Sequence, residues 1–108
     1  MSVQVYIGLG SNLDNPQTHI YTALTELRSL ALDDAVVSSP LYVTSPVGPR
    51  DQPDYVNAVA GFDTRLDAHE LLHEILDIEQ KHGRKRTGSQ WGPRTLDLDL
   101  LLYGEDVI

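Results

Sequence analysis

Two aspartates that interrupt a run of leucines are the residues in this sequence that most suggest chemistry. Asp97 and Asp99 alternate with leucines in the stretch TLDLDLLLY, at positions 95–103. Residues two apart in a strand point to the same face and lie about 6.5–7 Å apart along the chain. Two carboxylates held this close repel each other unless a cation lies between them or one of them is protonated.

Magnesium ions would satisfy these carboxylates. Magnesium takes carboxylate and phosphate oxygens in near-octahedral geometry, and two such ions about 4 Å apart can clamp a transferring phosphoryl group. Five of the eight basic residues lie nearby in the sequence, namely Lys81, Arg84, Lys85, Arg86 and Arg94. Taken alone, this basic cluster fits a solvated loop equally well, and the acids could simply pair with Arg94 on a polar sheet surface. Together, the acids and the five cations favour a site for a compact phosphorylated anion.

A second group of residues could bind a flat ring. Tyr55 can stack on a ring, and Asn57 offers both a donor and an acceptor to the edge of a heterocycle. The alternative is a sheet-surface aromatic residue with a polar neighbour. The Gly/Pro-rich segment 44–54 before them is of a kind that closes over ligands or merely connects elements. The four histidines do not suggest a ligand set, and His69 and His73 are expected on a helix surface.

Alternating apolar residues predict the strands that would position these groups. Strands are expected at 2–9, 35–44 and 55–64, and a fourth strand carries the aspartates. Pro40 cannot donate to a β-ladder, so part of the second strand is expected at an edge or a bulge. In the fourth strand, the leucines at 96, 98 and 100 are expected to face the core and the aspartates to face away from it.

Two helices are expected between these strands. The first starts after Asp14 or Asn15 and has Pro16 in its first turn. The second is capped by Asp67, has Glu70 in the capping-box position, and has Gly83 as its stop. The order βαββαβ predicts an α+β, ferredoxin-like fold. Its antiparallel sheet carries both helices on one face and the ligand site on the other. Residues 1–108 are expected to form a single domain.

Composition excludes several classes. The chain lacks cysteine, so disulfides and Cys-ligated zinc are excluded. Its net charge of −8 argues against a general nucleic-acid binder. The first residues lack a signal-peptide pattern and no apolar run reaches membrane-spanning length, so a cytoplasmic protein is expected.

Three segments together resemble one family along the whole chain. GLGSNL, TSPVGPRDQPDYVNAV and GRKRTGSQWGPRTLDLDLLLYG resemble the 6-hydroxymethyl-7,8-dihydropterin pyrophosphokinases of folate biosynthesis. The resemblance implies a ferredoxin-like enzyme that transfers pyrophosphate from ATP to the hydroxymethyl group of the pterin and releases AMP. Such a transfer requires the reactants to be positioned and their charge to be neutralised, and it needs no covalent intermediate. ATP and the pterin are the expected partners of a monomer, with no nucleic acid and no membrane.

The resemblance also implies roles for individual residues. Asp97 and Asp99 would bind two Mg²⁺ ions, and Arg84 and Arg94 would contact the phosphates; these four would be the catalytic residues. The pterin pocket would be lined by Gly10, Thr44, Ser45, Val47, Tyr55 and Asn57. The nucleotide would lie among Leu72, Glu79, Arg84, Trp91, Arg94 and Leu100.

One departure from the family bears on activity. Members of the family continue beyond the last residue of this sequence, with a Pro-His segment, a further arginine and an aromatic that stacks on the pterin. A shortened form is therefore expected. The alternative function is a catalytically weak metal- and nucleotide-binding module. An RNA-recognition domain would need aromatic pairs and a basic face, so the acidic composition argues against it. A protein-interaction domain remains open on composition alone.

Overall fold

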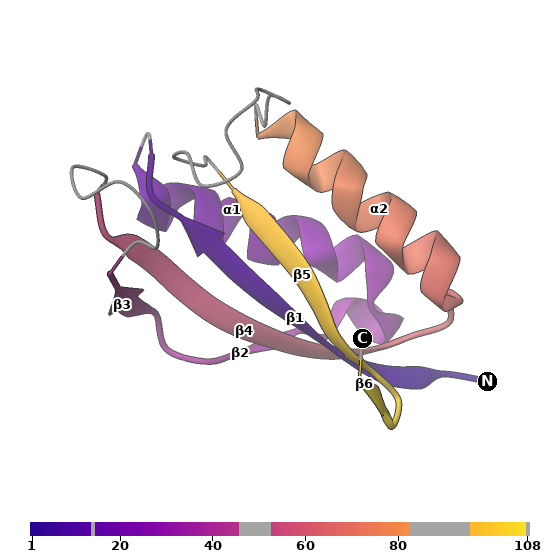
Figure 1. The fold of residues 1–108 in the computed structure, drawn as a ribbon. Coiled ribbons are helices and arrows are strands. Elements are labelled where there is room, and N and C mark those ends of the chain that lie inside the picture. The colour runs from indigo at the N-terminus through magenta and orange to yellow at the C-terminus, as the bar shows by residue number, and fades with distance from the viewer. Residues whose placement is uncertain (14, 46–52, 83–95, 108) are drawn as a thin grey trace.

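One antiparallel sheet carries two helices on a single face (Figure 1). The computed structural model describes residues 1–13, 15–45, 53–82 and 96–107. The strands are β1 (Val3–Ser11), β2 (Val37–Ser38), β3 (Tyr42–Thr44), β4 (Tyr55–Thr64), β5 (Asp97–Tyr103) and β6 (Asp106–Val107). The helices are α1 (Pro16–Leu27) and α2 (Ala68–Lys81), with short 3-10 turns at Arg28–Leu30 and Leu32–Asp34.

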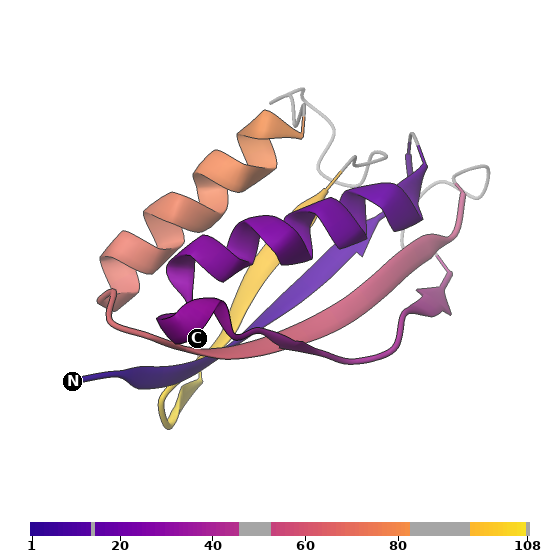
Figure 2. The same cartoon turned by 180° about the vertical axis from the view of Figure 1, so that it is seen from behind.

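The strand order confirms the expected ferredoxin-like fold. Within the described residues the sheet runs β2-β4-β1-β5-β6, and β3 also pairs with β4. All the pairings are antiparallel, and β1 lies in the middle because Ile7 pairs with Ala60 of β4 and with Leu100 of β5. Figure 2 shows both helices in front of the sheet, α1 over β1 and β4 and α2 over β5. The opposite face carries no helix in the part of the chain that is described.

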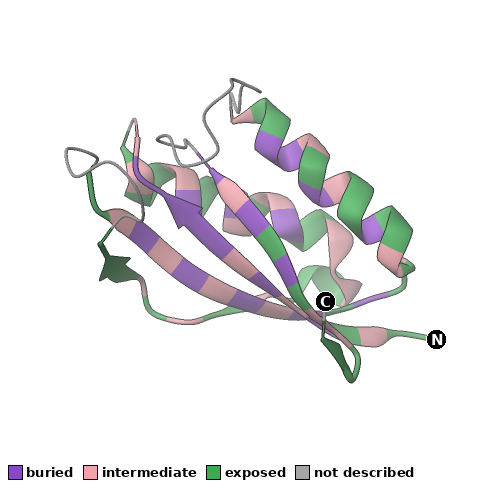
Figure 3. Ribbon diagram, viewed as in Figure 1, coloured by how far each residue is buried: buried purple, intermediate pink, exposed green. Residues whose placement is uncertain are grey.

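Alternation along the strands separates the core from this open face. In β4 every second residue is buried, as the purple bands of Figure 3 show. The core consists of residues from both helices and the inner sheet face: Val5, Ile7, Leu9, Ile20, Ala23, Leu27, Val56, Ala58, Ala60, Phe62, Leu71, Ile75, Ile78, Leu96, Leu98 and Leu100. Because alternate residues of each strand are buried against the helices, the residues between them face the open side of the sheet.

The predicted boundaries hold at most of the described positions. The backbone N–H of Glu70 donates to Asp67 Oδ1 at 2.8 Å, and the Asp67 N–H donates to Glu70 Oε1 at 2.9 Å, which confirms the capping box. The second extended run splits into β2 and β3 on either side of Pro40. Asn15 is the N-cap of α1 but has a left-handed backbone with φ of 62°, and its side chain makes no cap hydrogen bond. Gly83 lies outside the described residues. None of the helices in the described ranges is long and apolar enough to cross a membrane.

Candidate active site

Asp97 and Asp99 share the face of the sheet that lies away from the helices. They open β5, where Asp97 is half-buried and Asp99 is exposed, while Leu98 and Leu100 between and beyond them are buried against the helices. The predicted alternation is therefore correct. Both carboxylates project on the same side of one strand, so their mutual repulsion is a property of the fold and not only of the sequence.

Two glycines of β1 separate these acids from the ring-binding candidates. Asp97 pairs with Gly10, which pairs with Asn57 on its other side, so the three residues form a row across β5, β1 and β4. In the next row Asp99 pairs with Gly8. Neighbouring strands lie about 4.8 Å apart, so Asp97 and Asn57 are separated by roughly 10 Å across an open floor. That spacing accommodates a flat ring on one side and a phosphate group on the other.

Gly10 keeps the space beside Asn57 open. A Cβ at this position would lie 3.2 Å from Asn57 Oδ1 and 3.7 Å from Tyr55 Cδ1. A methyl group here would thus enter the gap that these two side chains border. Gly8 differs, since a Cβ there would make ordinary contacts of 3.5 Å or more with Leu101. The resemblance places Gly10 in the pterin pocket, and this contact pattern gives a physical reason for glycine.

Asn57 is held in one orientation by β3. Its Nδ2 donates to Thr44 Oγ1 at 2.8 Å and to the carbonyl oxygen of Tyr42 at 3.3 Å. Its Oδ1 is the atom that faces Gly10, and it accepts no hydrogen bond from residues in the described ranges. The structure thus brings Gly10, Thr44, Tyr55 and Asn57 together. Ser45, the residue after Thr44, is exposed at the end of β3.

A buried amide that the sequence analysis did not single out ties two turns together beside this group. Asn12 is only 2% exposed, and its Nδ2 donates to the carbonyl oxygen of Pro53 at 3.1 Å. This bond links the turn after β1 to the segment that leads into β4. The signal in the sequence was a pair of small polar residues, Ser11 and Asn12, directly after an apolar strand, and both are buried.

The three described residues expected around the nucleotide lie on the helical side of β5, and the structure does not bring them onto the face of the aspartates. Glu79 is 2% exposed, and its Oε2 accepts a hydrogen bond from the Leu98 backbone N–H at 2.7 Å. Leu100 is buried in the core, and Leu72 is exposed on α2. Their contact with a nucleotide stays a prediction. Val47, Arg84, Trp91 and Arg94 lie outside the described residues, so their predicted positions also stay predictions.

The chemistry of the acids fits magnesium. Within the described ranges no three His, Cys, Asp or Glu side chains converge on a metal position. Magnesium, however, is commonly bound through one or two carboxylates together with substrate phosphates and water. Asp97 and Asp99 supply such a pair on an accessible face, and they would hold magnesium together with a phosphorylated ligand.

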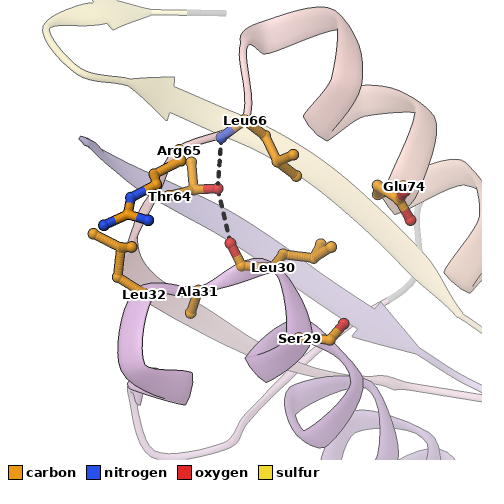
Figure 4. Close-up of a pocket in the computed structure, with 8 residues that line it drawn as sticks. All are labelled: Ser29, Leu30, Ala31, Leu32, Thr64, Arg65, Leu66 and Glu74. Carbon is orange, nitrogen blue, oxygen red and sulfur yellow. Dashed lines mark hydrogen bonds between the residues drawn. The ribbon is translucent and has the colours of Figure 1, made fainter. Parts of the chain in front are cut away.

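Two of the hollows in the described part of the chain are large, and both lie away from these residues. One of about 410 Å³ lies between the 3-10 turns that follow α1 and the end of β4, where Thr64 Oγ1 donates to the carbonyl oxygen of Leu30 (Figure 4). Because Thr64 pairs with Val3, this hollow is at the opposite end of β1 from Gly10. A second hollow of about 560 Å³ lies on the open face around Tyr6 and Gly61. Neither contains a residue that the sequence predicts for the site.

The histidines include one pair that the sequence analysis missed. His69 and His73 are exposed on α2, as expected. His82, at the end of α2, lies with its Nδ1 at 2.6 Å from His19 Nδ1, and its Nε2 is 2.5 Å from Glu26 Oε1. These contacts connect α2 to α1. His82 is far from His19 and Glu26 in the sequence, so no local spacing pattern predicts these contacts.

The chain is similar to proteins of one known family. Residues 6–108 match the model of the family described as 7,8-dihydro-6-hydroxymethylpterin-pyrophosphokinase. The chain is 47% identical over 106 residues to the 2-amino-4-hydroxy-6-hydroxymethyldihydropteridine pyrophosphokinase of Haemophilus influenzae, covering 98% of this chain and 66% of that protein. It is also 47% identical over its whole length to the enzyme of the same name from Pseudomonas aeruginosa, again covering 66% of that protein.

A longer relative contains the same unit. The folate synthesis bifunctional protein of Arabidopsis thaliana is 40% identical over 105 residues, which are 97% of this chain and 22% of that protein. The chain spans slightly less than two thirds of the length of the two bacterial relatives. The family match extends over nearly all of the chain. It includes both aspartates, the two glycines of β1 that pair with them, and Asn57. The chain therefore belongs to the 7,8-dihydro-6-hydroxymethylpterin-pyrophosphokinase family.

Proposed function

We propose that the chain transfers pyrophosphate from ATP to the hydroxymethyl group of 6-hydroxymethyl-7,8-dihydropterin and releases AMP, as a step of folate biosynthesis. The observation that carries this proposal is the row Asp97–Gly10–Asn57 across three neighbouring strands. It puts the Asp97 carboxylate and the fixed Asn57 amide on one open face with a glycine between them, and Asp99 lies in the next row beside Gly8. Family membership and the names of the relatives support the same activity.

The pterin is proposed to bind at the Asn57 end of the row. Asn57 would hydrogen-bond to the edge of the heterocycle through Oδ1, since Thr44 and Tyr42 already hold its Nδ2. Tyr55, whose ring borders the gap beside Gly10, would stack on the ring face. Ser45 and Val47 are proposed to complete this pocket. These contacts would direct the hydroxymethyl group toward β5.

The phosphates are proposed to bind at the Asp97 end. Asp97 and Asp99 would hold two magnesium ions, which, when bound, supply positive charge to the phosphate oxygens. Arg84 and Arg94 would contact the same phosphates. Leu72, Trp91 and Leu100 are proposed to surround the remainder of the nucleotide. ATP and pterin would then approach Gly8 and Gly10 of β1 from opposite sides.

The chemical step requires no covalent bond between the protein and either reactant. The hydroxymethyl oxygen of the pterin attacks the β-phosphorus of ATP and forms a new P–O bond. The bond from the β-phosphorus to the oxygen of the α-phosphate breaks, AMP leaves, and the hydroxyl proton is released. The chain's contribution is to hold the two reactants in line, which can supply a large part of a rate enhancement.

We further propose that residues 1–108 fold as one unit and act as a monomer in the cytoplasm, without nucleic-acid or membrane partners. The competing function is binding of metal and nucleotide without appreciable turnover.

Calorimetric titration and an AMP-release assay test the proposal together. We expect the 108-residue chain to bind ATP in a magnesium-dependent manner, to bind a pterin analogue, and to form AMP only when the pterin substrate is present. Binding of both ligands without AMP formation would support the binding module instead. Absence of magnesium-dependent ATP binding would refute both functions.

A further inference from the structure

A buried glutamate on α2 holds the backbone between the two aspartates. Glu79 Oε2 accepts a hydrogen bond from the N–H of Leu98 at 2.7 Å. Along one side β5 pairs with β1, and on the other side β6 pairs only with Leu102 and Tyr103. Among the described residues, the outer edge of β5 from Asp97 to Leu101 therefore has no neighbouring strand. Glu79 supplies the acceptor that a strand would otherwise offer at Leu98.

The hydrogen bond to Leu98 helps to explain why a glutamate is buried at position 79. Its exposed fraction is 2%, and the buried residues Ile75 and Ile78 precede it on the same helix. Glutamate is rarely buried to this extent unless it is paired, because its charge loses hydration. A leucine or methionine would fill a similar volume without that cost. The bond from the Leu98 N–H gives the buried Glu79 side chain a hydrogen-bond partner.

The position of Leu98 makes this bond relevant to the aspartates. The N–H groups of successive residues in a strand point to opposite edges. With the Leu98 N–H directed to Glu79, those of Asp97 and Asp99 lie on the β1 side, where their partners are Gly10 and Gly8. The peptide units on either side of Leu98 set the directions in which both aspartate side chains leave the backbone. Glu79 therefore fixes the segment from its outer edge.

This stretch of β5 has two reasons to move if it is not held. The two carboxylates lie on a shared face and repel each other. In addition, the register between β1 and β5 shifts just beyond them: Ile7 pairs with Leu100 and Tyr6 with Leu102, so Leu101 is an extra residue. A bulge bends and twists its strand. An anchor at Leu98 keeps that irregularity from spreading to the aspartates.

We infer that Glu79 is a positioning residue for the magnesium site, acting through the Leu98 backbone and not through contact with the nucleotide. The inference rests on the proposed function, because Asp97 and Asp99 are assigned to magnesium there. It differs from the expected role of Glu79 as a residue lining the nucleotide. The two roles predict different dependences on magnesium.

Variants of the 108-residue chain can separate these roles. Glu79→Met removes the acceptor at similar volume, whereas Glu79→Gln removes the charge but retains an oxygen. Glu74→Met and Glu74→Gln are matched controls, since Glu74 is half-buried on the same helix and lines the hollow at the far end of β1. The measurements are Leu98 amide hydrogen exchange by NMR, and ATP affinity with magnesium and with EDTA.

A positioning role predicts a specific pattern. In Glu79→Met, Leu98 exchange accelerates, and ATP affinity in magnesium falls by about tenfold or more, as for other residues that orient metal ligands. ATP affinity in EDTA and affinity for a pterin analogue stay unchanged. Glu79→Gln recovers most of the magnesium-dependent affinity, and both Glu74 variants match the unmodified chain. If Glu79→Met does not fold, Glu79→Leu, which also lacks the acceptor, is measured in its place and is expected to give the same pattern.

Other results would overturn it. If a folded variant without the acceptor, Glu79→Met or Glu79→Leu, has the same magnesium-dependent ATP affinity as the unmodified chain, the positioning role is refuted while the proposed function still holds. An equal loss of ATP affinity in magnesium and in EDTA would indicate direct contact with the nucleotide instead. Absence of magnesium-dependent ATP binding in the unmodified chain would refute the proposed function, and the inference with it.

Discussion

Substitution of Gly10 by alanine is the most direct test of how the pterin pocket is built. The new methyl carbon would lie 3.2 Å from Asn57 Oδ1 and 3.7 Å from Tyr55 Cδ1. The first of these is tighter than an ordinary carbon–oxygen contact, so either Asn57 shifts or the methyl group remains in the gap. In both cases the substitution alters the space proposed for the pterin and leaves the β5 side unchanged.

The expected cost can be estimated from the bonds involved. If Asn57 rotates away, it loses its 2.8 Å bond to Thr44, which contributes about 1 kcal/mol. If it stays, the pterin loses its hydrogen bonds to Asn57 or is pushed outward, a loss of about 1–3 kcal/mol. This corresponds to a fall in pterin affinity of roughly 5- to 150-fold. Alanine also restricts the unfolded chain, which raises stability by about 0.4–1 kcal/mol and offsets the tight contact.

Calorimetry with a pterin analogue and with magnesium-ATP measures both effects. We expect Gly10→Ala to weaken the analogue within the stated range, to leave ATP affinity within about twofold, and to change the free energy of unfolding by less than about 1 kcal/mol. Gly8→Ala is the matched control, because its methyl group makes only ordinary contacts with Leu101. If Gly10→Ala binds the analogue as tightly as the unmodified chain, the pterin does not occupy the gap beside Asn57.

Three further predictions follow from contacts described above. Asp97→Ala or Asp99→Ala should abolish magnesium-dependent ATP binding, and Asp99→Ala should leave thermal stability unchanged or raised, because one member of a repelling pair is removed; unchanged magnesium-dependent binding in both variants would contradict the assignment. Asn57→Ala should weaken a pterin analogue by about 1–3 kcal/mol and leave ATP affinity nearly constant, and calorimetry showing equal weakening of both ligands would indicate a role in the fold alone. His82→Ala should lower the free energy of unfolding by about 1–3 kcal/mol through loss of its contacts with α1, whereas His69→Ala on the exposed surface should leave it unchanged in chemical denaturation; equal effects would contradict the inter-helix link.

The fold was largely predictable because it follows from local patterns. The period-two alternation of apolar residues in Val3–Ser11 and Tyr55–Thr64 identified both strands and the faces they bury. The Asp67 capping box marked the start of α2 to the residue. The bulge at Leu101 was not predicted, because three consecutive leucines at 100–102 remove the alternation that would reveal a register shift. The short β6 was missed as well, since two residues carry no periodic signal.

The site was predictable only in part, for a different reason. The shared face of Asp97 and Asp99 follows from their spacing alone, and the pairing of Gly10 with Asn57 follows once the strands are aligned. The bonds from Glu79 to Leu98 and from Asn12 to Pro53 join residues from different elements. Such contacts depend on how helices and turns pack over the sheet, and a single sequence contains no pattern for them.

The central place of β1 has a consequence for how this chain is made. β1 precedes β4 and β5 in the chain, yet Ile7 pairs with Ala60 of β4 on one side and with Leu100 of β5 on the other. During translation the edge of β1 that pairs with β5 therefore stays unpaired until β5 has left the ribosome. Contacts between residues so distant in the chain slow folding, and the waiting edge can pair with another nascent chain. Chains interrupted before residue 97 should therefore associate and depend on chaperones, while those that extend through β5 close the sheet around β1.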